Sequence, residues 1–121
     1  MISKILNLLG PKLANLMYRH LEQAHMRALP DFSNLPNNLR IEFPSRIVNA
    51  GHMTVGDDVS IGPGCMLNAI KHYPGKFMQG VSPDIKPQQF RPEIRIGSRV
   101  SITGFATITA VNSVIIEDDV L

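Results

Sequence analysis

The 121-residue chain contains one cysteine, Cys65, no tryptophan and only 6% aromatic residues. A single cysteine excludes an internal disulfide, and no Cys/His cluster suggests structural zinc, so we expect no metal and a reducing, cytoplasmic setting. The formal net charge is +2. With few aromatic side chains, the chain lacks the basic, aromatic-interleaved patch that nucleic-acid binding requires, so we expect no nucleic-acid partner.

The chain also lacks a long hydrophobic run. The stretch at residues 5–9 is short, is interrupted by Asn7 and is stopped by Gly10 and Pro11, so it does not fit a signal peptide. No run approaches the length that would span a bilayer. We therefore expect a protein that is soluble or peripheral to a membrane.

Residues 2–28 show apolar side chains at spacings of three and four, which predicts an amphipathic helix. Gly10-Pro11 should split it into two helices. The favoured role is a cap that packs on the end of the following domain. The alternative is peripheral membrane association through 2–28, which the sparsely basic polar face disfavours. We expect His20 and His25 on the solvated face.

After residue 34 the apolar spacing becomes six. A strand-like alternation interrupted by one bend per repeat explains this spacing and predicts a triangular coil of short parallel strands. The first residue of each hexad should face the core, and the fifth should be small or branched. The aliphatic series comprises Leu35, Ile41, Ile47 and Met53, then Val55, Ile61 and Leu67, then Ile96, Ile102, Ile108 and Ile116.

Two acidic pairs and the cysteine fall inside this repeat. Asp57-Asp58 and Asp118-Asp119 occupy the same hexad positions, where a tight turn is expected. Repetition therefore explains them as turn residues rather than as catalytic carboxylates or metal ligands. Cys65 falls on the fifth position, so we interpret it as a small core residue.

The spacing is lost between about residues 70 and 93, where four prolines occur. Such a segment cannot supply coils of the six-residue repeat, so it should leave the body as an extended loop. His72 opens this loop and Asn68 lies just before it. Because loops often carry function, we predict Asn68 and His72 as substrate-binding candidates.

The segments 53–65, 95–102 and 108–121 resemble the hexapeptide-repeat acyltransferases, especially the capsule, lipopolysaccharide and small-sugar O-acetyltransferases. The resemblance implies a mainly β fold, a left-handed parallel β-helix, with an N-terminal α-helical segment. Residues 1–34 would form a helical cap, and residues 35–121 the β-helix coils with an extended loop at 70–93. It also implies a homotrimer with acyl-CoA bound between adjacent subunits.

By the same resemblance, the protein transfers an acyl group, with acetyl-CoA as donor, to a hydroxyl of a sugar or surface polysaccharide. The histidine motif of the family has no match here, so we expect the catalytic histidine beyond Leu121 and read the chain as an N-terminal portion. The alternative is a non-catalytic trimerising β-helix module. A nucleotidyltransferase is disfavoured because no phosphate-binding loop is present.

Overall fold

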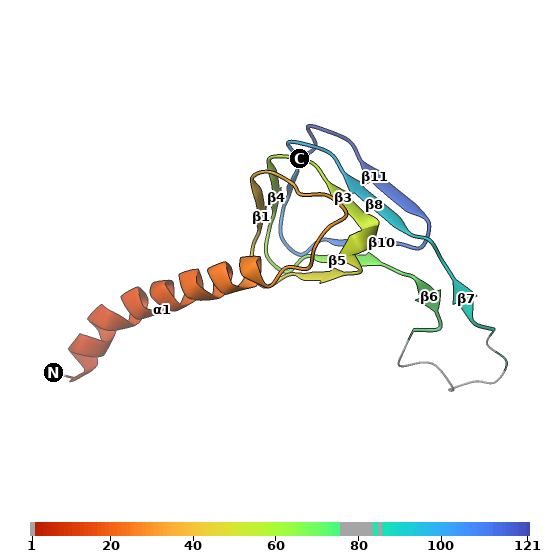
Figure 1. Ribbon diagram of the computed structural model, residues 1–121. Helices are drawn as coiled ribbons and strands as arrows, with labels where there is room; N and C mark the ends of the chain where they lie inside the picture. The colour runs from red at the N-terminus through yellow and green to blue at the C-terminus, as the bar shows by residue number, and fades with distance from the viewer. Residues whose placement is uncertain (1, 76–83, 85) are drawn as a thin grey trace.

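The computed structural model describes residues 2–75, 84 and 86–121, and these residues form one long helix and a series of short strands (Figure 1). The elements are α1 (Ile2–Arg27), β1 (Leu39–Ile41), β2 (Arg46–Val48), the 3-10 helix η1 (Ala50–His52), β3 (Met53–Val55), β4 (Val59–Ile61), β5 (Met66–Ala69), β6 (His72–Tyr73), β7 (Gln88–Gln89), β8 (Glu93–Ile96), β9 (Ser101–Ile102), β10 (Thr107–Ala110) and β11 (Ser113–Ile116).

Nine of the strands form three parallel sheets of three strands each around a narrow core (Figure 1). The strand orders are β1-β4-β9, β10-β5-β2 and β11-β8-β3. The chain visits the three sheets in turn, so strands that pair are well separated in sequence. Leu39, for example, lies opposite Val59.

The predicted fold class, a mainly β left-handed parallel β-helix, is wrong for this chain. The structure is mixed α/β, with a 26-residue helix and three small, separate parallel sheets. The error has a physical cause. A spacing of six sets one inward side chain and one bend per repeat, but it determines neither the direction in which the chain winds nor how much helix precedes the sheets.

The inward-facing positions of the parallel strands are confirmed. Val55, Ile61, Leu67 and Ile96 are at most 1% exposed. Each row continues into the next strand, because Val55 lies opposite Ile96, and Ile61 and Leu67 lie opposite partly buried isoleucines. Ile41 and Met53 are also 0% exposed. Four further predicted positions are partly buried and pack against this core: Ile47, Ile102, Ile108 and Ile116.

Leu35 is the exception among the aliphatic positions, with 92% of its surface exposed. It precedes the first strand, so no sheet surrounds it. Cys65, in contrast, is buried in the core as predicted.

The predicted break in the N-terminal helix is also wrong, because α1 runs continuously with Pro11 inside it. Pro11 removes one backbone donor, but the helix is exposed here and a Cβ added at Gly10 would meet no atom of another element within 4 Å, so no neighbouring element forces a break. Only the end of the helical segment reaches the sheets. Met26, Leu29 and Phe32 pack against the core, and the Ile41 amide lies 3.4 Å from the Met26 sulfur.

His25 does not share the solvated environment that the sequence predicts for it. Its ring meets the Phe43 ring edge-on at a centroid distance of 5.5 Å, and its Nε2 is buried without a hydrogen-bond partner among the described residues. His25 is half-buried because the last turn of α1 lies against the body. His20, five residues earlier, is exposed as expected.

The acidic pairs form turns, as predicted. Asp58 and Asp119 adopt left-handed backbone conformations with φ of 58° and 60°. Their neighbours bind backbone amides: Asp57 accepts a 2.9 Å hydrogen bond from the amide of Asn37, and Asp118 a 2.7 Å bond from that of Ser98. These carboxylates therefore stabilise the corners that join the sheets.

Candidate functional site

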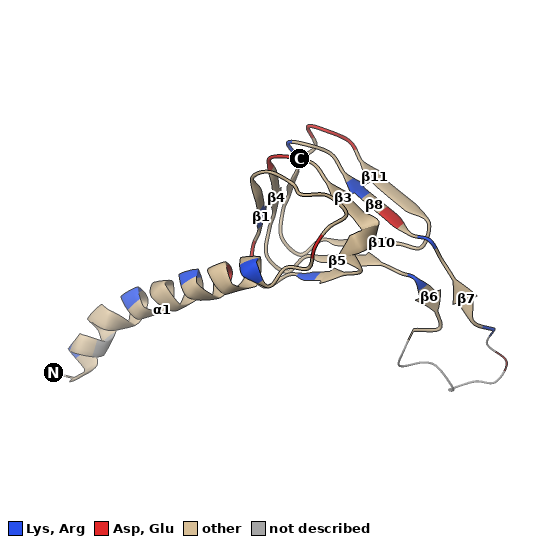
Figure 2. Cartoon of the chain, in the orientation of Figure 1, with Lys and Arg blue, Asp and Glu red and all other residues tan. Residues whose placement is uncertain are grey.

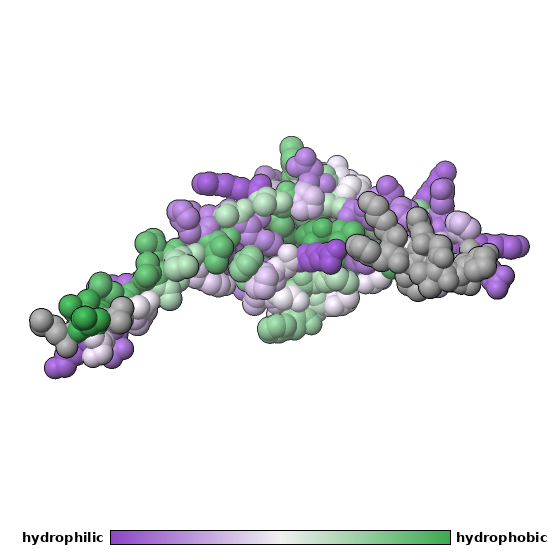
Figure 3. Space-filling model, turned by 90° about the horizontal axis from the view of Figure 1, so that it is seen from below, coloured by the Kyte–Doolittle hydropathy of each residue, from purple (hydrophilic) through white to green (hydrophobic). Residues whose placement is uncertain are grey.

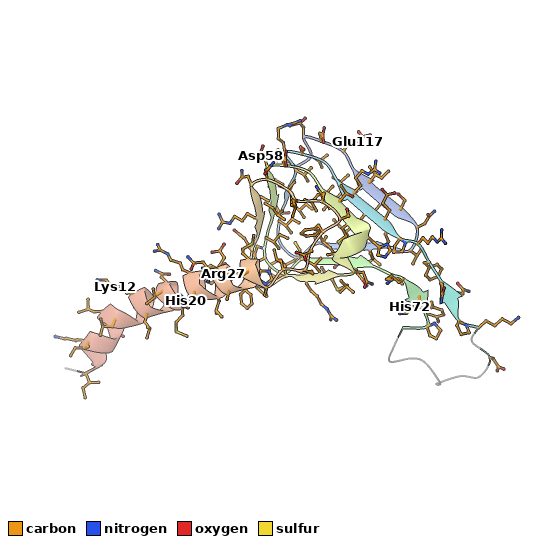
Figure 4. All side chains as sticks on the ribbon, viewed as in Figure 1. Lys12, His20, Arg27, Asp58, His72 and Glu117 are labelled. Carbon is orange, nitrogen blue, oxygen red and sulfur yellow. The ribbon has the colours of Figure 1, made fainter. Side chains whose placement is uncertain are left out.

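Asn68 and His72, the two residues predicted from sequence, line one hollow of about 310 Å³ where the 70–93 segment leaves the body. In Figure 4, His72 lies on β6 at the start of this segment, away from the core. The complete lining is Asn49, Asn68, Ile70, Lys71, His72, Tyr73 and Gly75.

Strand alternation places Asn68 at this surface. Leu67 and Ala69 of β5 are buried, so the Asn68 side chain between them points away from the core. Asn68 also belongs to the central strand of its sheet, with Val48 and Thr109 opposite it on the two neighbouring strands. The amide is therefore held on a rigid element.

A short antiparallel pair positions His72. Strand β6 pairs with β7, with His72 opposite Gln89 and Tyr73 opposite Gln88. These two strands lead outward from the body (Figure 1). Residues 76–83 and 85 of the predicted loop lie outside the described residues. His72 and Tyr73 are exposed, so both side chains are accessible to a ligand.

Asn49 completes the hollow, and sequence reasoning missed it. It sits between β2 and η1 with φ 60° and ψ 51°, a conformation that asparagine tolerates better than most residues. Its Nδ2 donates a 2.7 Å hydrogen bond to the Ala69 carbonyl. The sequence feature that could have identified it is an asparagine between Ile47 and Met53, the first residues of two successive hexads, where a bend is expected.

A second hollow, of about 260 Å³, lies along the β6–β7 pair. His72 and Tyr73 line both hollows, and the second adds Pro74, Pro87, Gln88 and Gln89. Because the same two side chains face both spaces, one bound molecule in contact with them can extend from the body onto the β6–β7 pair.

The charged residues around this region are mostly cationic. Among the described residues of the 70–93 segment, Lys71, Lys86 and Arg91 carry positive charge, and the acids are Asp84 and Glu93. A 2.7 Å backbone hydrogen bond from Phe90 to Lys71 brings Arg91 close to the start of β6. Figure 2 shows these cations along both limbs of the segment. An anionic group would be attracted here.

The lining determines what chemistry the hollows support. They offer amides, an imidazole, a phenol and an ammonium, which suits hydrogen bonding to a polar ligand. Neither lining contains an aspartate or glutamate to orient His72 as a base. Within the described part of the chain, no group of three or more His, Cys, Asp or Glu residues is placed to hold a metal ion.

The remaining reactive groups lie elsewhere. Cys65 is buried, with its sulfur 3.5 Å from the Thr103 carbonyl, so no substrate reaches it. Asp119 accepts hydrogen bonds from the Arg99 guanidinium at 2.6 and 3.1 Å, an exposed contact at a corner.

No family model, no curated protein and no solved structure matches this chain.

Proposed function

We propose that this chain is part of an acyl-CoA-dependent O-acyltransferase whose sugar acceptor binds in the hollow that Asn68 and His72 share. The observation that carries the proposal is the convergence of these side chains with Lys71 and Tyr73 around about 310 Å³. The resemblance of the hexads to O-acetyltransferases supplies the reaction class.

A sugar suits this hollow because its hydroxyls both donate and accept hydrogen bonds. The amide of Asn68 and the imidazole of His72 can each do either. Tyr73, 45% exposed, adds an aromatic face with a polar end, against which the carbon face of a sugar ring can pack. The volume lies at the lower end of the about 300–1,000 Å³ typical of small-molecule sites, which fits one sugar unit.

The donor in this proposal is acetyl-CoA, whose phosphates are anionic. Lys71, Lys86 and Arg91 supply positive charge beside the acceptor hollow. The acids among the described residues of the segment are Asp84 and Glu93, and Glu93 is paired with Arg95 at 2.7 Å. Binding both substrates at one place converts the transfer into a reaction between positioned groups.

The chemistry is direct acyl transfer. A base removes the proton of the acceptor hydroxyl, its oxygen forms a bond to the thioester carbonyl carbon, and the carbon–sulfur bond breaks to release CoA as the thiol after protonation. Because no carboxylate lines either hollow, we assign His72 to acceptor binding and assign no catalytic base. A homotrimer in the cytoplasm belongs to the same proposal.

Acceptor binding is tested directly on the 121-residue chain. A panel of monosaccharides is titrated into the isotope-labelled protein while backbone amide shifts are recorded by NMR. We expect the largest shifts at Asn49, Asn68 and His72. Asn68→Ala and His72→Ala should each weaken binding by about 3- to 10-fold, the usual effect of one lost hydrogen bond.

Matched controls exist on α1, where Asn15 and His20 are exposed and far from the hollow. Asn15→Ala and His20→Ala should leave sugar binding unchanged. Activity is then measured as thiol release from acetyl-CoA in the presence of the sugar that binds. We expect His72→Ala to raise the KM for the sugar more than it lowers kcat.

Three results would count against the proposal. If the substitutions at Asn68 and His72 changed sugar binding no more than the control substitutions on α1, these two residues would not bind the acceptor. A trimer with neither sugar binding nor thiol release would favour the non-catalytic module. A complete loss of kcat in His72→Ala, with normal sugar binding, would make His72 the base instead of a binding residue.

A further inference from the structure

The first five turns of α1 form an apolar surface that contacts nothing else in the described chain. Figure 1 shows the helix projecting away from the sheets, and it reaches them only from Glu22 onward. Its large apolar side chains are therefore exposed: Ile2, Ile5, Leu8, Leu9, Leu13, Leu16, Met17 and Leu21 have 48% to 76% of their surface accessible.

Helical geometry gathers most of these side chains on one face. At about 100° per residue, Ile2, Ile5, Leu9, Leu13, Leu16 and Met17 fall within an arc of about 120°. Asn7 and Asn15 fall on the opposite face. In the space-filling view, hydrophobic residues gather along the exposed helix beside hydrophilic ones (Figure 3). The capping role predicted from sequence does not cover this arc.

The charge on the same stretch has one sign. Residues 2–21 include Lys4, Lys12 and Arg19 and no aspartate or glutamate. The first acid, Glu22, pairs with Arg40 of β1 at 3.0 Å, where the helix meets the body. By the same geometry, Lys12 and Arg19 border one edge of the apolar arc. An apolar arc edged by cations is the pattern of a helix that lies in an anionic membrane surface.

We infer that α1 docks the protein on an anionic lipid membrane, with its apolar arc in the interface and with Lys12 and Arg19 among the headgroups. No helix of the described residues is long and apolar enough to cross a membrane. The helix instead lies along the surface. Over residues 2–21 its length is about 30 Å, which gives a continuous contact.

A second copy of the chain fits this face less well than lipid. Helices that pair along an apolar seam use opposite charges beside the seam to choose each other. Here the side chains available beside it are Lys12 and Arg19 on both copies, and residues 2–21 contain no acid to oppose them. Charge complementarity therefore favours anionic headgroups over self-association.

The inference is tested by flotation of the 121-residue chain with two kinds of vesicle. One is phosphatidylcholine alone, and the other is phosphatidylcholine mixed with phosphatidylglycerol. We expect strong binding to the mixed vesicles and weak binding to the neutral ones. Each cation near the surface contributes about fivefold to the partition coefficient, so binding should fall steeply as salt is added.

Two pairs of substitutions, together with one control pair, separate the apolar and the charged contributions to vesicle binding. Leu9→Gln with Leu16→Gln should reduce partition by at least about tenfold, because two large apolar side chains leave the interface. The matched control, Asn7→Gln with Asn15→Gln on the opposite face, should change it little. Lys12→Gln with Arg19→Gln should reduce binding to mixed vesicles by about 25-fold.

Circular dichroism of each variant checks that the helix persists, which we expect because residues 2–21 contact no other element. Equal effects of the leucine and asparagine pairs, or equal binding to neutral and anionic vesicles, would overturn the inference. So would an oligomer in solution that the leucine substitutions dissociate while no vesicle binds. None of these outcomes bears on sugar binding at His72, so the two proposals fail independently.

Discussion

The side chain of Asn34 pairs with the backbone of Val55 in both directions. Its Nδ2 donates to the Val55 carbonyl at 2.6 Å, and its Oδ1 accepts from the Val55 amide at 3.0 Å. Val55 ends β3, the edge strand of its sheet, and on the other side it pairs with Ile96. The Asn34 side chain, together with the Ser33 amide that donates to the Met53 carbonyl at 2.9 Å, thus takes the place of a further strand at this edge.

This relationship predicts that Asn34→Ala destabilises the fold by about 1–3 kcal/mol, because two backbone groups next to the core lose their partner. Asn34→Asp should be intermediate, since a carboxylate still accepts from the Val55 amide but cannot donate. The urea midpoints of the variants provide the measurement. Asn15→Ala, on the exposed helix, is the control and should stay near the parent value.

The buried aliphatic rows predict a sharp contrast between two isoleucines. Ile61 is 0% exposed in the central strand of its sheet, whereas Ile115 is 58% exposed on β11. Ile61→Ala should cost about 2–5 kcal/mol, because it removes buried methyl groups and leaves a cavity. Ile115→Ala should cost under about 0.5 kcal/mol. Similar costs at both sites would mean that the inward register is wrong.

Replacing glycine by alanine should destabilise the protein at Gly97 but stabilise the helix at Gly10. A methyl group on Gly97 would lie 2.6 Å from the Asp118 amide nitrogen and 2.7 Å from the Glu117 carbonyl carbon, so neighbouring backbone would have to move. Gly97→Ala should therefore lower the unfolding midpoint. Gly10 lies in the exposed helix, where an added methyl group would meet no atom of another element within 4 Å. Gly10→Ala should raise helix content, because alanine favours a helix by about 1 kcal/mol.

The positions that could be predicted from sequence are those set by local repetition. Val55, Ile61 and Ile96 were placed in the core because each begins a hexad, and all three are buried. The turn role of the acidic pairs followed from their repeated positions. The position of Asn68 and His72 at the start of the loop predicts that both bind substrate, and the structure brings them into one hollow.

What could not be predicted depends on contacts between distant residues. Asn34 and Val55 are 21 residues apart, and no spacing rule links them. Asn49 enters the hollow through a bond to Ala69, 20 residues away. The burial of His25 depends on where the last turn of α1 meets Phe43. The predicted fold class is wrong for a related reason, since a spacing of six does not determine the direction in which the chain winds.

The pair formed by Arg99 and Asp119 predicts a pH dependence of stability. The hydrogen bond from Arg99, and then its positive charge, lower the pKa of Asp119 below the usual 3.8. A carboxylate with a lowered pKa in the folded state stabilises the protein above the unfolded pKa. That contribution is lost as the pH falls from about 3.8 through the lower folded value.

Asp119→Asn tests this dependence without disturbing the backbone, because asparagine also tolerates the φ of 60° found there. At pH 7 the variant should have a slightly lower urea midpoint than the parent chain. The effect is small because the pair is exposed, and added salt should reduce it further. Below pH 3.8 the two midpoints should converge, since protonation removes the same charge that the substitution removes. Glu117→Gln, exposed on the same turn, makes the same change in net charge and should show a smaller difference at pH 7. A midpoint difference for Asp119→Asn that persists unchanged in acid would mean that the effect is steric and that the ion pair contributes nothing.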